Sequence, residues 1–327
     1  MKLIVTGGSG FIGSNFIDYW LSNHPDDKIT NIDKLTYASN PWFNRFATTS
    51  QNYEFKKIDI SKRNDFVNAF DDTEVVVNFA AESHVDRSII DPGEFIKSNI
   101  FGVYNLLEIA RKKDFRFHQV STDEVYGSLG STHDPSFTEE SAYNPRNPYA
   151  ATKASADFLV RSYVNTYGIK ATISNCGNNF GPHQHPEKLI PKTIISALNN
   201  LKISIYGTGQ QIRDWVFVED HCSAIEAILY NGKLGKTYLI GANNEIRNID
   251  LVRKILEILH KGQNLIEFVK DRPGHDIRYS LSSEKIKQEL GWRPKHSFGE
   301  ALATTVEHYR NNIYVYEKMI TTLSTFR

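Results

Sequence analysis

The chain has 327 residues, of which 40% are hydrophobic, so it is long enough to bury a sizeable core. Lysine plus arginine equals aspartate plus glutamate, 38 of each, so the basic surplus of a general nucleic-acid-binding protein is missing. No apolar run is long enough to span a membrane, and Cys176 and Cys222 lie in no metal or redox motif. We therefore expect a cytoplasmic protein without a metal, a membrane anchor or a nucleic-acid partner.

Short apolar runs alternate with helical patterns along the first half of the chain. The helical patterns include 11–23 and 99–113. The apolar runs predict strands at 2–6, 28–32, 53–58, 74–80, 115–121 and 170–175. This alternation predicts βαβ units, and therefore an α/β fold with a Rossmann-type doubly wound parallel sheet. Ligands of such sheets bind at the carboxyl ends of the strands.

The second half has fewer strand patterns and more prolines. Helices are predicted at 189–200, 219–231, 249–260, 283–290 and 298–312. We expect a first domain over 1–178 and a smaller, mainly helical lobe over 179–327. Segments near 214–242 are expected to return to the sheet of the first domain.

A glycine-rich turn, TGGSGFIG at 6–13, follows the first strand and opens the first helix. Glycines there let the backbone approach a pyrophosphate, and the helix N-terminus offers free N–H groups. Asp33 ends the second strand, twenty residues after Gly13. A carboxylate in this place suits the ribose hydroxyls of NAD and repels the extra phosphate of NADP. The turn therefore predicts NAD as cofactor, and an ordinary glycine turn is the alternative.

A helix is predicted over 147–168, with Asn147 as its cap and Gly168 at its end. Tyr149 and Lys153 are four residues apart, so they share one face of this helix. A free tyrosine has a pKa of about 10, and a nearby ammonium favours its phenolate. The pair could therefore take a proton from an alcohol while a hydride leaves the same carbon. The alternative is a solvated helix face.

Together these motifs resemble the extended short-chain dehydrogenase/reductase family. The segments that carry the resemblance are TGGSGFIG, NFAAESHVDRS at 78–88, Thr122, and Tyr149 with Lys153. Members act on nucleotide sugars as 4-epimerases, decarboxylases, reductases and dehydratases. The resemblance covers nearly the whole chain and implies the Rossmann-type fold and NAD.

The stretch STDEVYG at 121–127 indicates which members of this family the chain resembles most. Asp123 and Glu124 follow Thr122 at the end of a buried strand, where carboxylates cost desolvation unless they are paired or used. This stretch resembles the nucleotide-diphosphate-glucose 4,6-dehydratases. Further matching segments are NIDKLTYA at 31–38, PEKLIP at 186–191, QIRDW at 211–215 and DRPGHD at 271–276.

The resemblance implies a role for each catalytic residue. Tyr149, beside Lys153, takes the proton of the sugar 4-hydroxyl while the C4 hydride moves to NAD, and Thr122 hydrogen-bonds the developing oxygen. Glu124 removes the C5 proton, and Asp123 protonates the C6 hydroxyl, which leaves as water. Hydride return to C6 then gives a 4-keto-6-deoxy sugar nucleotide. Such a step needs two acids in unlike environments; the alternative is a capped turn with two solvated acids.

The resemblance also implies the binding residues. For the cofactor they are Gly7, Gly10, Phe11, Ile12, Gly13, Asp33, Lys34, Leu35, Thr36, Asp59, Ile60, Ala80, Ala81, Ser83, Ser98, Tyr149, Lys153 and Asn179. For the sugar nucleotide they are Ser83, Thr122, Asn178, Lys188, Leu189, Arg213, Asn248, Arg272 and His275. The cations among them suit a diphosphate, because arginine makes bidentate phosphate contacts.

The nucleotide base is left open: the resemblance favours thymidine, with uridine and cytidine as alternatives. A nucleotide-sugar 4-epimerase or uronate decarboxylase is a further alternative, although neither needs the acid Asp123. A non-catalytic NAD-binding protein ranks last, because Tyr149 and Lys153 are both present. The chain departs from the family pattern at Ser39, where glycine is usual, at Gly177 and Phe180, where serine and tyrosine are common, and at the His-Gln-His run at 183–185. We expect these departures to lie near the substrate pocket.

Two helices carry apolar residues on more than one face, which predicts a homodimer. They lie at 99–113 and 149–167, and the apolar positions of the first are Ile100, Val103, Leu106 and Leu107. Folds of this family pair the two helices with those of a second copy as a four-helix bundle.

Overall fold

The computed structural model describes the chain except for residues 63–66, 272–273 and 325–327, and except for the side chains of residues 321–324. Seven parallel strands form the central sheet, in the order β10-β6-β5-β4-β1-β2-β3. Their bounds are β1 Lys2–Thr6, β2 Lys28–Asp33, β3 Tyr53–Lys57, β4 Val75–Asn78, β5 Arg116–Thr122, β6 Ala171–Cys176 and β10 Thr237–Ile240. The prediction of a doubly wound α/β fold is confirmed. The strand order reverses between β1 and β4, which is where such sheets bind their ligands.

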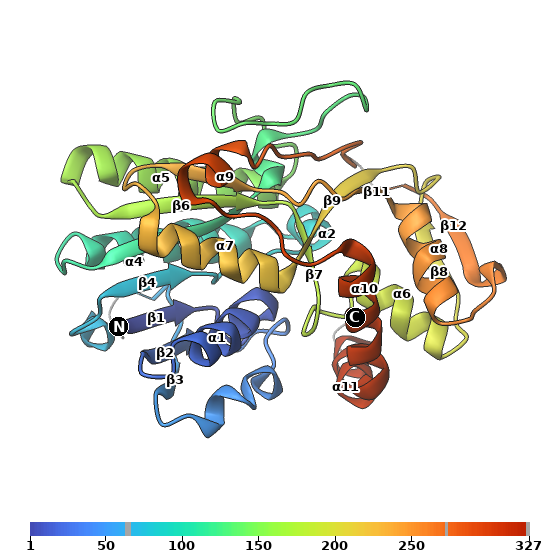
Figure 1. Cartoon of the computed structure of the whole chain (residues 1–327), viewed down its shortest axis with the longest axis horizontal. Coiled ribbons are helices and arrows are strands. Elements are labelled where there is room, and N and C mark those ends of the chain that lie inside the picture. Colours follow the sequence, from blue (N-terminus) through green and yellow to red (C-terminus); the bar gives the residue numbers. More distant parts are fainter. Residues whose placement is uncertain (63–66, 272–273, 325–327) are drawn as a thin grey trace.

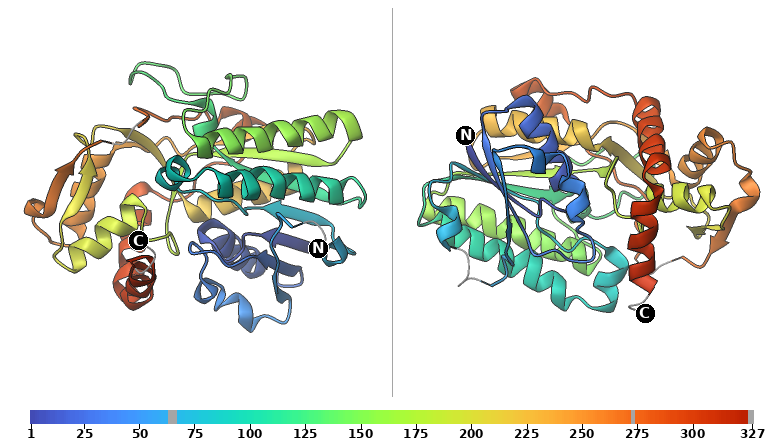
Figure 2. Two further views of the ribbon diagram at one scale, coloured as in Figure 1. Left: turned by 180° about the vertical axis from the view of Figure 1, so that it is seen from behind. Right: turned by 90° about the horizontal axis from the view of Figure 1, so that it is seen from below.

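Helices cover both faces of this sheet because its strands alternate their side chains between two apolar clusters. Leu3 and Val5 of β1 pack on one face, with α1 (Phe11–Asn23) and α7 (Val218–Asn231). Ile4 packs on the other face, with α4 (Gly102–Ala110) and α5 (Pro148–Tyr167). Helices α1 and α7 face the viewer in Figure 1, and α4 and α5 lie side by side in the view from behind in Figure 2.

The chain before α4 differs from the predicted helix 99–113. Helices α2 (Val85–Ile90) and α3 (Gly93–Phe95) come first, and a π-helical segment, η5 (Ile96–Phe101), leads directly into α4. A π-helical turn holds more residues than an α-helical one, so a search for the 3.6-residue period misplaces its start. Short 3₁₀ helices occur at Pro41–Asn44, Ala47–Thr49, Val67–Phe70, Asp123–Tyr126 (η6) and Gln263–Leu265.

The second lobe is mainly helical, and its described residues also form two small sheets (Figure 1). Its helices are α6 Leu189–Leu198, α8 Asn248–Ile258, α10 Phe298–Asn311 and α11 Ile313–Ser324. Its strands are β7 Asn178–Phe180, β8 Ile203–Tyr206, β9 Ile212–Phe217, β11 Glu245–Arg247 and β12 Ile266–Val269. Of the stretch 214–242, β10 pairs with β6 in the central sheet, whereas β9 pairs with β7 and β11. Helix α9 (Glu284–Leu290) packs beside β10 and α7.

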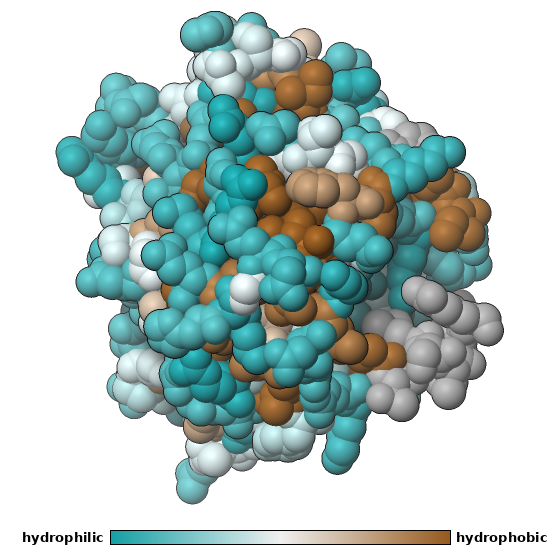
Figure 3. Space-filling model, turned by 90° about the vertical axis from the view of Figure 1, so that its right-hand side faces the viewer, coloured by the Kyte–Doolittle hydropathy of each residue, from teal (hydrophilic) through white to brown (hydrophobic). Residues whose placement is uncertain are grey.

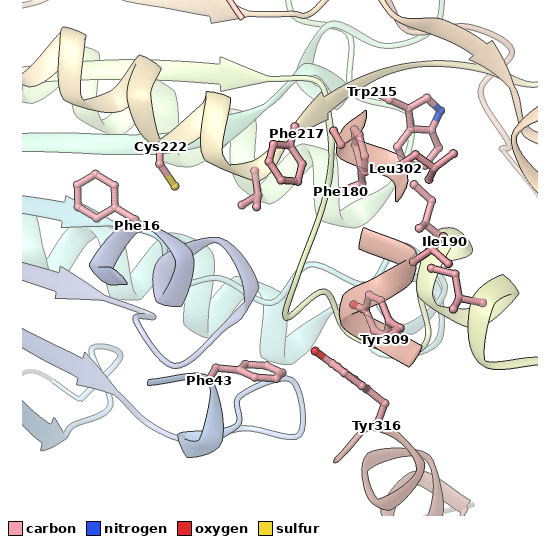
Figure 4. Packing of buried hydrophobic residues seen from close by; sticks show 14 of the residues in the cluster. Phe16, Phe43, Phe180, Ile190, Trp215, Phe217, Cys222, Leu302, Tyr309 and Tyr316 are labelled. Carbon is pink, nitrogen blue, oxygen red and sulfur yellow. The ribbon is translucent and has the colours of Figure 1, made fainter. Parts of the chain in front are cut away.

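One apolar cluster runs from the central sheet into the second lobe (Figure 4). It contains Phe16 of α1, Phe180 of β7, Ile190 of α6 and Tyr309 of α10. Cys222 of α7 is fully buried in the same cluster, and both cysteines are free, so they pack as small apolar side chains. The shared cluster holds the second lobe against the carboxyl ends of the strands.

The face that the second lobe turns outward is mostly hydrophilic, with hydrophobic side chains gathered near its middle (Figure 3). Exposed hydrophobic residues of this lobe include Leu201, Tyr206 and Phe268. Among the described helices, none combines the length and the apolarity needed to cross a bilayer.

Candidate active site

The turn between β1 and α1 packs so closely against neighbouring backbone that two of its glycines have no room for a side chain. Gly7 has φ +72°, and a Cβ placed on it would lie 2.6 Å from the backbone nitrogen of Ala80. A Cβ on Gly13 would lie 2.4 Å from the carbonyl oxygen of Gly7. Gly10 is the N-cap of α1, and it has no side chain that could bond the first N–H groups of the helix. The turn therefore offers bare backbone donors at a positive helix end, which fits the pyrophosphate of NAD.

Asp33, at the end of β2, is held by three hydrogen bonds. Its Oδ2 accepts from the backbone N–H of Ser9 at 3.0 Å, and its Oδ1 accepts from the N–H of Leu35 at 2.8 Å and Oγ of Ser39 at 2.9 Å. Burial raises the pKa of Asp33, and these bonds lower it. A carboxylate offers about four acceptor positions, so one is left for a ribose hydroxyl. Ser39, a departure from the family pattern, thus lies directly against the carboxylate.

Other predicted cofactor residues surround this turn. Lys34 Nζ lies 3.7 Å from Glu82 Oε1, so its charge is partly neutralised. Asp59 Oδ1 accepts from Oγ of Ser61 at 2.7 Å, which fixes the loop after β3. The remaining predicted residues here are Phe11, Ile12 and Thr36 beside the turn, Ile60 after β3, Ala80, Ala81 and Ser83 after β4, and Ser98 in η5. All of them except Ser98 follow the carboxyl ends of strands or open α1.

Asn179 differs from these residues, because both polar atoms of its side chain are hydrogen-bonded to other groups of the protein. Its Oδ1 lies 2.9 Å from Nδ1 of His221, and its Nδ2 donates to the carbonyl oxygen of Gly177 at 3.1 Å. The side chain therefore joins β7 to α7.

The start of α5 meets the end of β5. The side chain of Tyr149 is hydrogen-bonded to that of Thr122, and the backbone N–H of Tyr149 donates to Oγ of Ser88 at 3.2 Å. Lys153 Nζ donates to the carbonyl oxygen of Val120 at 2.7 Å. Tyr149, Lys153 and Thr122 are all nine-tenths buried or more. The structure thus brings these three predicted catalytic residues together.

Burial dominates the ionisation of this pair. It raises the pKa of Tyr149, and the nearby charge of Glu124 raises it further, against the hydrogen bond with Thr122. Burial lowers the pKa of Lys153 to about 8, against the charge of Asp157. The spacing on the helix predicted a lowered pKa for Tyr149. The direction is reversed first because the phenol is buried, and then because Glu124 lies near it, while Lys153 donates to the carbonyl of Val120.

The adjacent acids stand in unlike environments. Asp123 is 2% exposed, and burial together with the charge of Glu124 raises its pKa from 3.8 to about 8, so it is protonated at neutral pH. Its Oδ1 accepts from Oγ1 of Thr122 at 3.1 Å, and its Oδ2 is buried without a partner among the described residues. Glu124 is less buried, and its Oε2 accepts from Nδ2 of Asn147 at 3.1 Å. A proton donor and a candidate base therefore stand side by side.

A strand of the second lobe, β9, brings an arginine near these acids. Arg213 of β9 is 5% exposed and its guanidinium lies 4.3 Å from the ring centroid of Tyr279. Its NH2 group donates to the carbonyl oxygen of Asp276 at 2.9 Å. The charge of Arg213 lowers the pKa of Asp123, which places a cation of the second lobe near the acid pair.

Two other predicted substrate residues have open acceptors. Asn178 and Asn248 each carry a buried side-chain oxygen with no partner among the described residues, which suits a ligand donor. Lys188 Nζ donates to the carbonyl oxygen of Ser83 at 3.1 Å, and Leu189 begins α6 directly after it. His275 Nδ1 lies 2.7 Å from Oδ1 of Asp271. The predicted residue Arg272 lies outside the described residues.

The His-Gln-His run, taken from sequence as part of the substrate pocket, begins elsewhere. His183 stacks on Phe43 with ring centroids 4.7 Å apart, and its Nδ1 lies 3.0 Å from Oγ of Ser14 in α1. It therefore packs behind α1, beside the C-terminal helices, with a φ of +71°. His185 of the same run packs edge-on against Tyr37 after β2, and its Nδ1 lies 3.3 Å from Oε1 of Glu187.

Sequence reasoning missed some contacts of this site. Asn147 was predicted only as a helix cap, and it also holds Glu124; Ser39 holds Asp33. A sequence pattern does not show which of these side chains form hydrogen bonds with one another. The described residues contain no group of three or more His, Cys, Asp or Glu side chains arranged to hold a metal ion.

Comparisons with known proteins agree with this geometry. Residues 4–305 match the sequence model of the family described as GDP-mannose 4,6 dehydratase. The chain belongs to this family. It is 46% identical to a dTDP-glucose 4,6-dehydratase of Haemophilus influenzae, over 95% of this chain and 98% of that protein. The predicted resemblance to the nucleotide-sugar dehydratases is thereby confirmed.

Solved structures of similar proteins share the whole fold. A dTDP-glucose 4,6-dehydratase from Streptomyces venezuelae, solved with NAD bound, has a TM-score of 0.95 and 41% identity, over 98% of this chain and 100% of that one. A UDP-glucose 4-epimerase from Thermotoga maritima has a TM-score of 0.88 at 27% identity, over 96% of this chain and 100% of that one. The chain is thus more similar to this dehydratase than to the epimerase, in sequence and in structure.

Proposed function

We propose that this protein is an NAD-dependent dTDP-glucose 4,6-dehydratase. The observation that carries the proposal is the pairing of Asp123, protonated at neutral pH, with Glu124 beside Tyr149. Elimination of water needs a positioned acid and a positioned base in one site. The similarity to dTDP-glucose 4,6-dehydratases over 95% of the chain supports the same reading.

Bound NAD would supply the hydride acceptor for oxidation at C4 of the glucose and the hydride donor for the later reduction at C6. The residues that would hold it are the glycines of the first turn and Asp33, whose free acceptor position suits a ribose hydroxyl. Tyr149, as its phenolate, takes the proton of the 4-hydroxyl, and Thr122, bonded to Tyr149, orients that oxygen.

The two acids carry out the elimination. The 4-ketone acidifies the C5 proton, which Glu124 removes, while Asp123 gives its proton to the C6 hydroxyl as that group leaves as water. Glu124 then returns its proton to C5. At the end Tyr149 holds one proton more and Asp123 one fewer. The hydroxyl of Thr122 is bonded to both, so it offers a short path for resetting them.

Rapid mixing with dTDP-glucose tests the roles separately. Asp123→Asn and Glu124→Gln should accumulate reduced cofactor and a 4-keto-glucose nucleotide, because an amide neither donates nor accepts the proton. Tyr149→Phe should form neither. Loss of one positioned acid or base costs about 10²–10⁴-fold in turnover.

Glu140→Gln, which removes an exposed carboxylate from a nearby loop, is the matched control and should turn over like the wild type. Wild-type rates in both Asp123→Asn and Glu124→Gln would overturn the proposal. Formation of a 4-epimer without water loss would assign the site to the epimerases instead. Assays with the thymidine, uridine and cytidine diphosphates of glucose identify the base, and the thymidine compound should have the highest kcat/KM.

We also propose a homodimer that works in the cytoplasm, where NAD and nucleotide sugars are available together. Support for the dimer comes from exposed apolar side chains beside α4 and α5: Ile90 is 84% exposed, and Phe101 and Phe158 are each 54% exposed. Of the residues named from sequence, Val103 and Leu106 are buried in the protein's own core, with Leu107, and Ile100 is half-buried. Residues 1–178 would bind the cofactor and 179–327 the sugar nucleotide, with β10 returning to the first unit.

A further inference from the structure

Two side-chain contacts join the chain after β2 to the chain after β4. Lys34, the first residue after β2, has its Nζ 3.7 Å from Oε1 of Glu82 in the loop after β4. The guanidinium carbon of Arg87, in α2 beyond that loop, lies 3.7 Å from the ring centroid of Tyr37. The mechanism above gives neither contact a task.

Both contacts cross the end of β1. This strand lies between β2 and β4, so a side chain that follows β2 meets one that follows β4 only beyond the end of β1. Neighbouring strands lie about 4.8 Å apart, which separates β2 from β4 by about 10 Å. The glycine turn continues from β1, and Ala80 of the loop after β4 lies directly against Gly7 of this turn. The two contacts therefore span the place where a pyrophosphate would bind.

The backbone on each side of the turn is held independently of these contacts. After β2, the N–H of Asn40 donates to the carbonyl oxygen of Ser9 at 2.9 Å. After β4, the side chain of Asn99 bonds both backbone groups of Glu82: Oδ1 accepts from the N–H at 2.9 Å, and Nδ2 donates to the carbonyl oxygen at 3.0 Å. Rotation of the two long cationic side chains can therefore break the contacts while this backbone stays in place.

Glu82 has the wrong charge for binding the cofactor directly. Its side chain is 11% exposed, and a carboxylate repels the pyrophosphate of a dinucleotide. Its ionic partner is Lys34, whose side chain is 28% exposed. The acid therefore serves to hold the lysine across the turn.

We propose that the Lys34–Glu82 and Tyr37–Arg87 contacts form a clasp over the glycine turn that keeps NAD bound between the two hydride transfers. The inference deepens the proposed function and rests on it, because that reaction returns the hydride to the sugar that supplied it. Reduced cofactor that left after the first transfer would leave the sugar as a ketone. Release of the dinucleotide requires both contacts to open.

Release of NAD in the absence of sugar tests the clasp. The protein is loaded with NAD and diluted into ethanol and alcohol dehydrogenase, which reduce only the NAD that has left the protein. Glu82→Gln keeps the shape of the side chain and both backbone bonds to Asn99, and it loses the charge. It should release NAD about two- to fivefold faster than wild type, as expected for the loss of an ion pair of this exposure.

The direction of the Glu82→Gln effect separates a clasp from simple electrostatics. Removal of a negative charge beside an anion site would by itself tighten NAD binding and slow its release. Faster release is expected only if the acid holds Lys34 across the turn. Unchanged or slower release would therefore overturn the proposal.

A double variant tests whether Lys34 and Glu82 act as a pair. Lys34→Met should also release NAD faster, and Lys34→Met with Glu82→Gln should be no faster than Lys34→Met alone, because the acid matters only while the lysine is present. Further acceleration in the double variant would show two independent effects and overturn the pair. Lys97→Met, which breaks an exposed pair with Glu94 at 2.7 Å, is the matched control and should release NAD like wild type.

The second contact gives a separate test should Glu82→Gln fail to fold. Arg87→Met keeps most of the apolar part of the side chain and loses the cation over Tyr37, so it should release NAD about two- to fivefold faster. Release at the wild-type rate in Arg87→Met would overturn the clasp as a joint device of both contacts.

Because these measurements contain no sugar, they stand even if dTDP-glucose is not the substrate. With dTDP-glucose, Glu82→Gln should lose reduced cofactor and a 4-keto-glucose nucleotide into solution more often than wild type. A wild-type protein that makes no 4-keto-6-deoxy product would refute the proposed function, whereas wild-type release of NAD in Glu82→Gln would refute the clasp.

Discussion

Single residues at the end of β5 show how sequence neighbours acquire different chemistry. Asp123 points into the protein, where one oxygen accepts from Thr122 and the other meets no donor in the part of the chain that the structure describes, whereas Glu124 points toward the cap of α5. The sequence predicted that both acids lie at the end of this strand. Which of them is neutral depends on burial, and burial follows from the direction of each side chain in the 3₁₀ turn η6.

The buried acid should make the protein less stable as the pH rises. The pKa of Asp123 is about 8 in the folded chain and about 3.9 in an unfolded one, so the folded state binds more protons between these values. Stability therefore falls from about pH 4 to pH 8. Asp123→Asn removes this dependence and should be more stable than wild type at pH 8, by about 5 kcal/mol from linkage between these two pKa values, and similar at pH 4. Urea unfolding at both pH values measures the difference; a variant less stable than wild type at pH 8 would contradict the neutral Asp123.

Asp33 should set the choice between the two dinucleotides. Asp33→Ala removes the acceptor for the ribose hydroxyls and the repulsion of a 2′-phosphate, so the preference for NAD over NADP should shrink. Ser39→Gly keeps the carboxylate and loses one bond to it, so it should bind NAD more weakly but keep the preference. Fluorescence titration with both cofactors measures the ratio. A wild-type protein that binds NADP more tightly would contradict this assignment.

At the scale of elements, the N-terminus of α5 combines capping with catalysis. Asn147 accepts from the backbone N–H of Ala150 at 2.8 Å through Oδ1 and donates to Glu124 through Nδ2. Asn147→Ser should keep the cap and lose the donor. Its stability should stay near wild type while turnover falls about tenfold, since a hydrogen bond to a charged group contributes about 1.5–3 kcal/mol.

Asn147→Ala provides the contrast, because it loses both interactions of the cap residue. It should be about 1 kcal/mol less stable than Asn147→Ser in thermal unfolding. Reduced cofactor should accumulate in both variants during rapid mixing, since the proton removal at C5 is the slowed step. Wild-type turnover in Asn147→Ser would show that Glu124 does not need its amide partner.

The elements that sequence predicted well are those with a strong local pattern. The first strand was predicted at 2–6 and the first helix at 11–23, and β1 and α1 have these bounds. The short strands β8 and β12 were missed because four residues carry too little periodicity, and their pairing joins distant parts of the chain. The contacts of Lys34 and Tyr37 escaped prediction for the same reason: their partners follow β4, which only the folded sheet brings close to the end of β2.

For the whole molecule, the position of the site follows from the two lobes sharing one core. The central sheet supplies the cofactor turn and the catalytic strand end, and β9 of the second lobe brings Arg213 near Asp123. The apolar cluster that links α1 to α6 and α10 fixes this arrangement (Figure 4). The fold therefore brings Asp123 and Arg213 near one another although they are 90 positions apart in the sequence.

The outer face of α4 and α5 should hold two copies of the chain together. It leaves Phe101 and Phe158 exposed, and large apolar side chains grouped on one face are typical of an interface. Phe101→Asp should convert a dimer into a monomer, because a charge cannot be buried there without a partner. Phe268→Asp, which alters an equally exposed phenylalanine of the second lobe, should remain dimeric. Light scattering at micromolar concentration gives the masses, and a monomeric wild type, or an unchanged mass for Phe101→Asp, would place the interface elsewhere.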